Sequence, residues 1–279
     1  DGYIHLVQHL DGNFNLSVAL SSDSEVAIDS TAESMHLAIH EIEIENVDIN
    51  KLNEENQMML DAFIQQADAK FSTSNEHTAV HFDSRFELNI IQEGDTSFIK
   101  HKHFDLDTEL DYNTVEEILT LEPTKIHLEN AEFDMKGFVN FKDDMYVDFT
   151  FNGNKDNYDL VFAMAPEELI PTLKRYENKG RIFFETNVKG KTANGQMPAI
   201  NATFGCENGF FKNTVKNKQV DDLNFTGSFT NGTAKDFSTM KLILNDFTAK
   251  PEEGQLVANL EITNFDDPEI EFQINSSFE

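Results

Sequence analysis

Histidines are the side chains of this sequence whose spacing best suits metal chemistry. His77 and His81 are four residues apart, and His101 and His103 are two apart, which on a strand places both rings on one face. Four imidazoles on neighbouring strands could hold a zinc ion. The spacing of His77 and His81 is helical, however, in a segment whose pattern predicts a strand. We therefore interpret these residues as surface histidines of a sheet and predict no metal site.

The single cysteine and the acidic runs carry no catalytic signature. Cys206 lies in a turn-like segment, and its nearest histidine in the sequence is His127. Acidic residues alternate over 105–111, but a calcium loop also needs a turn glycine and a closing glutamate, which this run lacks. The sequence contains no nucleophile elbow, phosphate-binding loop or dinucleotide fingerprint. We expect a protein that is not an enzyme and that needs no cofactor.

The composition restricts the partners of the chain. Its 279 residues include 51 Asp and Glu against 21 Lys and Arg, for a formal net charge of -30. Such a field repels phosphate backbones, which excludes nucleic acid, and anionic membrane surfaces also repel the exterior. Contact with lipid must then use a sheltered apolar surface. The 25 Phe suit such a surface, because this side chain has no polar group to satisfy.

Apolar and polar residues alternate with a period of two along most of the chain, which predicts strands with one apolar and one wet face. Clear runs are Met145, Val147, Phe149 and Phe151; Tyr158, Leu160 and Phe162; Met240, Leu242 and Leu244; and Leu256, Ala258, Leu260 and Ile262. Turn signals separate the runs, among them Asn152-Gly153-Asn154, Asn208-Gly209 and Asn231-Gly232. Many strands joined by short hairpins form an antiparallel meander, so we predict a fold dominated by β structure.

Two segments interrupt the alternation and predict short helices. Residues 51–69 contain no Gly or Pro, and their helical stripe consists of Leu52, Met59, Phe63 and Ala67. Residues 165–179 predict the second helix, with Pro166 at its start, Pro171 limiting its length and Gly180 ending it.

The chain has no low-complexity linker and no clean change of composition. We predict an N-terminal β lobe over residues 1–75, with the first helix starting near 51, and a continuous β region over residues 76–279. The sequence opens within a strand pattern and without an initiator Met, so we interpret it as a piece of a longer protein. No stretch reaches the ~18 apolar residues of a membrane span.

The apolar faces of these strands allow two interpretations. They form either a packed core or a groove for acyl chains, where burial contributes ~0.8 kcal/mol per methylene and so favours long-chain ligands over small ones. Periodicity does not choose between the two.

The C-terminal two-thirds of the chain resembles the AsmA-like proteins of Bacteroidetes-type bacteria. The resemblance lies in a series of short sequence segments and in their order over about 180 residues, and it contains no catalytic motif. Its segments are 98–107, 119–128, 138–141, 147–153, 160–173, 180–190, 198–205, 208–209 and 223–268. Members of this family are typically tethered to the inner membrane by an N-terminal helix and project a long β-groove into the periplasm. They are associated with the movement of phospholipid to the outer membrane.

The resemblance therefore implies a periplasmic, inner-membrane-anchored protein that carries phospholipid through an apolar β-groove and contributes to outer-membrane homeostasis. Its partners would be phospholipid acyl chains and other envelope proteins. We expect a long antiparallel meander curled into an elongated groove. The residues that we expect to line it are Met145, Val147, Phe149, Phe151, Leu160, Phe162, Leu242, Leu244, Leu260 and Ile262. The alternative is a closed-core all-β binding or scaffold module of the cell envelope.

Overall fold

The computed structural model describes residues 2–10, 15, 40–54, 58–92, 95–96, 100–142, 145–165, 169–192, 196–252 and 254–277. Its strands are β1 (Gly2–Gln8), β2 (Glu41–Asn53), β3 (Met58–Ser74), β4 (His77–Gln92), β5 (Asp95–Thr96), β6 (Lys102–Asn113), β7 (Ile118–Leu128), β8 (Ala131–Asn140), β9 (Tyr146–Lys155), β10 (Tyr176–Lys191), β11 (Ala199–Asn213), β12 (Lys218–Thr230), β13 (Lys241–Pro251), β14 (Gln255–Thr263) and β15 (Glu269–Ser277). The helices are α2 (Asp159–Met164) and α3 (Ile170–Leu173), and the 3-10 turn η2 covers Phe237–Thr239.

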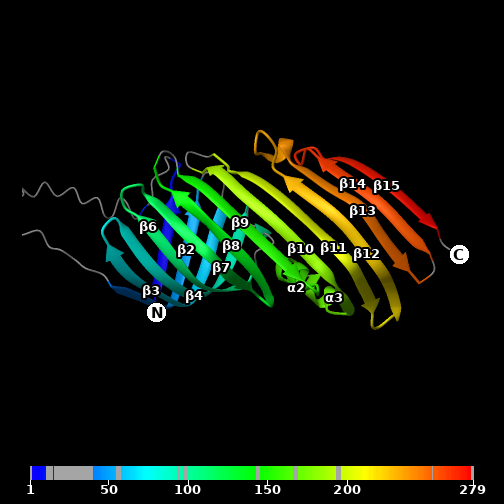
Figure 1. Cartoon of the computed structure of the whole chain (residues 1–279), viewed down its shortest axis with the longest axis horizontal. Helices are drawn as coiled ribbons and strands as arrows, with labels where there is room; N and C mark the ends of the chain where they lie inside the picture. Colours follow the sequence, from blue (N-terminus) through cyan, green and yellow to red (C-terminus); the bar gives the residue numbers. More distant parts are fainter. Residues whose placement is uncertain are drawn as a thin grey trace, which may run out of the picture.

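The strands of the described residues form one long sheet. Fourteen of them pair in chain order, and the two-residue β5 pairs with β4 off this path. Neighbouring strands are antiparallel except β1 and β2, which run parallel. The sheet curls without closing, and its strands follow one another along the long axis of the molecule (Figure 1). The prediction of an all-β meander curled into an elongated groove is confirmed.

The helix predicted over residues 51–69 is wrong, because this segment is the end of β2 and most of β3. Leu52 pairs with Met59 across the two strands. Leu60, Ala62 and Ile64 alternate as a strand should, but the register shifts between Ile64 and Gln66, so the alternation changes phase there. This bulge hid the strand pattern. Pairing with β2 and β4 on both sides overrides the helix propensity of the residues.

The second predicted helix is also placed differently. The structure has α2 at Asp159–Met164 and α3 at Ile170–Leu173, so the alternation predicted as a strand at Tyr158, Leu160 and Phe162 is helical. Pro166 lies outside the described residues. Gly180 does not end a helix; it lies in β10 with φ of 126°. A Cβ there would be 2.6 Å from the Cα of Gly209, so the two strands approach too closely for a side chain.

The three turn signals named above have different outcomes. Asn231-Gly232 follows β12 as a turn, in agreement with the prediction, and Gly232 has φ of 72°. Asn208-Gly209 lies within β11, where the pairing with β12 shifts register. Asn152-Gly153-Asn154 lies inside β9 rather than in a turn. A Cβ on Gly153 would be 2.3 Å from Cε1 of Phe184, so this glycine leaves room for a ring from β10.

The buried core is small and lies where α2 packs on the sheet. Its members come from α2 with the adjoining Tyr158, and from β7, β8, β10 and β11: Leu128, Ala131, Phe133, Tyr158, Leu160, Ala163, Ile182 and Cys206. The predicted boundary between lobes at residue 75 falls in the turn between β3 and β4. Pairing of these strands extends from Met58–Gln92 to Ser74–His77. The division into two lobes stays a prediction.

Candidate functional site

Strand register places apolar side chains in rows that cross the sheet on one face, which we call the trough face. One row crosses β8 to β15: Met135, Phe151, Thr186, Ala202, Phe229, Leu242, Ile262 and Ile270. Another crosses β2 to β8: Val47, Ile64, Phe86, Phe104, Leu128 and Ala131. Because neighbours in a row point to the same side, the apolar surface is continuous from strand to strand.

Phenylalanine rings contact one another along this face. Phe86 and Phe104 stack with ring centroids 5.1 Å apart. Phe225 and Phe247 stack at 6.3 Å, and Phe149 lies 6.2 Å from Phe151. These rings are polarizable and apolar, and they carry no hydrogen-bonding group.

Much of the trough face stays partly open to solvent, because α2 and α3 are the only described elements outside the sheet that lie over it. Large residues such as Phe149, Phe151 and Leu244 are half-buried. At the β15 end, Ile270, Phe272 and Ile274 are 64%, 56% and 57% exposed. A contiguous exposed apolar surface of this kind is typical of a binding surface.

The structure places most of the predicted groove residues together. Seven of them lie on the trough face of β9, β13 and β14: Val147, Phe149, Phe151, Leu242, Leu244, Leu260 and Ile262. Leu160 and Phe162 lie on α2, and Leu160 is buried in the core. Met145 lies in the turn before β9 and is 38% exposed.

The opposite face carries most of the charge, arranged as cross-strand pairs. Lys189 donates to Asp148, and Lys125 to Glu132. The hydrogen bond between the latter two raises the pKa of Lys125 and lowers the pKa of Glu132. These pairs are solvated and contribute mainly to solubility.

His77 and His81 also form cross-strand pairs with carboxylates on this face. His77 contacts Asp111 at 2.7 Å, and His81 contacts Glu109 at 2.9 Å. Within the part of the chain that the structure describes, no group of three His, Cys, Asp or Glu side chains is arranged to hold a metal ion. His77 and His81 instead each have a carboxylate partner on the neighbouring strand β6.

Cys206 is a buried thiol. Tyr158, which is also buried, places its hydroxyl 3.3 Å from the Cys206 sulfur. Burial is the main cause that raises the pKa of both groups above their ordinary values. A thiol held neutral is a weak nucleophile, which gives this pair a packing role.

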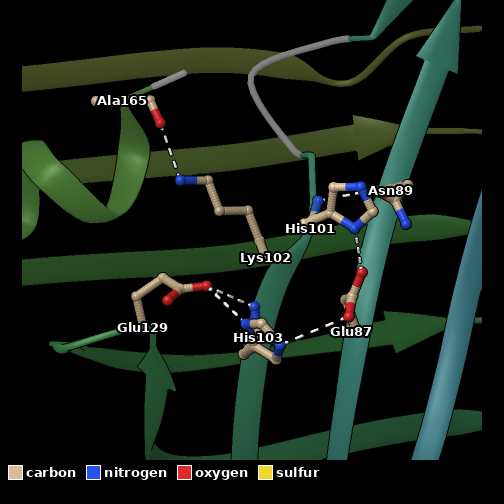
Figure 2. A network of polar contacts seen from close by, with 7 residues as sticks. All are labelled: Glu87, Asn89, His101, Lys102, His103, Glu129 and Ala165. Carbon is tan, nitrogen blue, oxygen red and sulfur yellow. Dashed lines mark hydrogen bonds and ion pairs between the residues drawn. The ribbon is translucent and has the colours of Figure 1, made fainter. Parts of the chain in front are cut away.

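A cavity with both polar and apolar lining opens where α2 and α3 meet the start of β6 and the β7–β8 turn. Its volume is about 440 Å³, and its lining includes Lys100, His101, Lys102, His103, Glu129, Asn130, Asp159, Phe162, Ala163, Ile170, Pro171 and Lys174. Figure 2 shows Lys102 reaching Ala165 at the end of α2, while His101 and His103 contact Glu87 on β4.

Sequence reasoning missed Lys102. It lies in β6 on the trough face, opposite Leu88, and is only 5% exposed. The sequence did hold a signal: Lys102, Phe104 and Leu106 are spaced two residues apart, so Lys102 occupies a position of that strand where apolar residues are expected. A lysine in the apolar phase of an alternating strand is expensive to bury and therefore indicates a specific role.

These features define the class of protein by architecture: an open, curled single sheet whose trough face is apolar and whose other face is charged. Comparison with family models, curated proteins and solved structures gave no significant match. The described helices include none with the length and apolar character needed to cross a membrane.

Proposed function

We propose that this chain binds phospholipid by its acyl chains in the trough and conveys it between the inner and outer membranes of a bacterial envelope. The observation that carries the proposal is the continuous apolar trough face, which no second layer of the described residues covers over most of its length. Family resemblance alone supports the periplasmic location, the inner-membrane anchor and the role in outer-membrane homeostasis.

The physical chemistry of the trough face favours a long apolar ligand. Ten methylenes buried from water contribute roughly 8 kcal/mol. Aligned rows from strand to strand let an acyl chain exchange one set of contacts for an equivalent set. Movement along the sheet then requires no covalent chemistry, and the proposal assigns no catalytic residue.

The closed-core alternative predicts a dry interior in which residues such as Phe149 and Phe151 are fully buried. Both are half-buried in a sheet that does not close. We therefore retain the lipid-binding proposal and do not propose the closed scaffold module.

The direct experiment is mass spectrometry of lipids that co-purify with the chain from bacterial cells. We expect phospholipid at a stoichiometric level. Purified protein without lipid, after extraction that preserves known lipid complexes, would contradict the proposal.

A matched pair of variants localises the binding. Phe149→Glu places a charge on the trough face, whereas Thr150→Glu places it on the opposite face of the same strand. We expect Phe149→Glu to remove bound lipid while the strand stays folded, because Phe149 is not fully buried. Equal lipid content in both variants would argue against the trough as the binding surface.

A further inference from the structure

Lys102 is the one charged residue among the described residues that is classed as buried. It ends a row of the trough face that consists of Ile4, Ile49, Ala62 and Leu88. Burial of an ammonium group is unfavourable unless it is paired or hydrogen-bonded. The position of Lys102 at the margin of an apolar surface therefore carries a desolvation cost in free energy.

Among the described residues, the ammonium of Lys102 has a hydrogen-bond partner for only part of its capacity. It donates one hydrogen bond of 2.9 Å, to the carbonyl oxygen of Ala165. An ammonium has three N–H donors, and no carboxylate of the described residues forms an ion pair with Lys102. With respect to the described residues, the remaining donors can serve a group in the cavity that Lys102 lines.

The cavity gathers further positive charge. Lys100 and Lys174 line it with Lys102, in a chain that has 51 acidic and only 21 basic residues. Two carboxylates also line it, and both already accept hydrogen bonds. Glu129 accepts from the backbone N–H of His103 at 2.8 Å, and Asp159 accepts from Asn157 at 2.7 Å.

The cavity is amphipathic. Phe162, Ala163 and Ile170 line the same space as the lysines, and Ala163 belongs to the core that joins α2 to the trough face. A ligand that fits must carry an anionic group next to an apolar body. A phosphate bonded to a glycerol with acyl chains has this chemistry, and charge-assisted hydrogen bonds from lysine suit its oxygens.

We propose that this cavity receives the phosphate of a phospholipid head group, held by Lys102 and Lys174 with Lys100 beside them, while the acyl chains continue onto the trough face. This inference rests on the proposed lipid-binding function and deepens it. It makes the part of the trough beside α2 and α3 a place where a head group is recognised, in contrast to the rest of the trough face, which contacts only acyl chains.

A purely structural role for Lys102 would be to satisfy the last carbonyls of α2. Lys174 separates the two explanations, because it lines the cavity and has no hydrogen bond to Ala165. Lys174→Gln removes a positive charge from the cavity and leaves the bond between Lys102 and Ala165 in place. Lys136→Gln, at an exposed position of β8, is the matched control.

The test uses the whole chain, stripped of lipid, and isothermal titration with three probes: dioctanoyl phosphatidylglycerol, dioctanoylglycerol and inorganic phosphate. We expect the phosphatidylglycerol to bind about ten-fold or more tightly than the diacylglycerol, corresponding to about 1.4 kcal/mol. Lys174→Gln and Lys102→Met should reduce this ratio several-fold, and Lys136→Gln should retain it. Circular dichroism checks that each variant is folded.

The outcomes distinguish the two proposals. Equal affinity for both lipids in the wild-type chain, or an unchanged ratio in Lys174→Gln, overturns the head-group site and leaves lipid binding intact. Failure to bind either lipid contradicts lipid binding itself and with it the head-group site. Binding of inorganic phosphate with no preference between the two lipids would assign the cavity to free phosphate and overturn the inference.

Discussion

The ring of Phe184 on β10 occupies the space in which a side chain of Gly153 on β9 would lie. These two residues pair across the strands. A Cβ on Gly153 would lie 2.3 Å from Cε1 of Phe184 and 3.1 Å from Cδ1 of Leu160 on α2. The ring of Phe184 is itself in contact with Phe133, with the centroids 5.4 Å apart. Gly153 thus lets one aromatic side chain cover the strand beneath α2.

Replacement of Gly153 by Ala should therefore destabilise the fold. A methyl group added to a filled site forces neighbouring side chains out of place, at a cost of about 1–3 kcal/mol. Gly2→Ala is the control, because a Cβ there would meet Val47 at an ordinary distance of 3.7 Å. Urea denaturation of both variants tests this. A Gly153→Ala variant as stable as Gly2→Ala would show that Phe184 can move at no cost.

Leu244 and Ile243 offer a second test of the trough face. They are neighbours in β13, but Leu244 pairs with Leu260 on the trough face and Ile243 pairs with Glu261 on the charged face. We expect Leu244→Asn to lower bound lipid markedly and Ile243→Asn to leave it near the wild-type level. Quantitative lipid extraction from the purified variants measures the difference. The opposite order would move the lipid to the charged face.

Asn231 should be essential for stability. It is 1% exposed, its side chain donates to the carbonyl of Pro198 at 2.9 Å, and it accepts from the N–H of Ile200 at 2.8 Å. Asn231→Ala leaves both backbone groups without a partner and should lower the free energy of unfolding by roughly 2–4 kcal/mol.

Asn224→Ala is the comparison for Asn231→Ala. Asn224 also bonds to backbone groups, but at a more exposed site where water can replace it. Its substitution should cost less than about 1 kcal/mol. Similar denaturation midpoints for the two variants would contradict the structural role of Asn231.

The buried pair Tyr158 and Cys206 predicts loss of stability at alkaline pH. Folding raises the pKa of both groups, so the unfolded chain releases their protons first as pH rises. The ordinary pKa is 10.0 for Tyr158 and 9.0 for Cys206. The stability that each neutral group contributes is fully present below its ordinary pKa and is lost as the pH rises above that value toward the raised pKa of the folded state. Each group then lowers the unfolding free energy by about 1.4 kcal/mol per pH unit.

Tyr158→Phe isolates the contribution of the phenol. This variant cannot ionise at position 158, so its free energy of unfolding should fall less steeply than that of the wild type above pH 10.0. Urea denaturation between pH 7 and about 11 compares the slopes. Parallel curves would show that Tyr158 does not contribute to the alkaline transition.

Local pattern predicted strands best where alternation was unbroken. The runs at Val147–Phe151 and Leu242–Leu244 are strands with the expected apolar face. It failed at residues 51–69, where a bulge after Ile64 shifted the phase, and at Tyr158–Phe162, where a strand-like run is a helix on the sheet. Local propensity is weak in both places, and pairing or packing partners far along the chain decide the conformation.

The candidate groove residues show the same limit. Residues two apart in a strand point to the same face, so the sequence alone grouped Phe149 with Phe151 and Leu260 with Ile262. Register between strands is a long-range property, and it was needed to align these groups into rows. The partner of Lys102 is Ala165, which follows α2 and lies 63 residues away in the chain, so local pattern could not predict it.

By itself the sequence determined the fold class of this protein, because its period-two alternation and Phe content specify strands with one apolar face. Tertiary structure decided that the sheet stays open, that the two described helices lie over one part of the trough face, and that a buried lysine lies at its margin. The physical reason is that alternation fixes which way each side chain points from its own strand. Closure, coverage and charge burial depend on contacts between strands and helices that are distant in the chain.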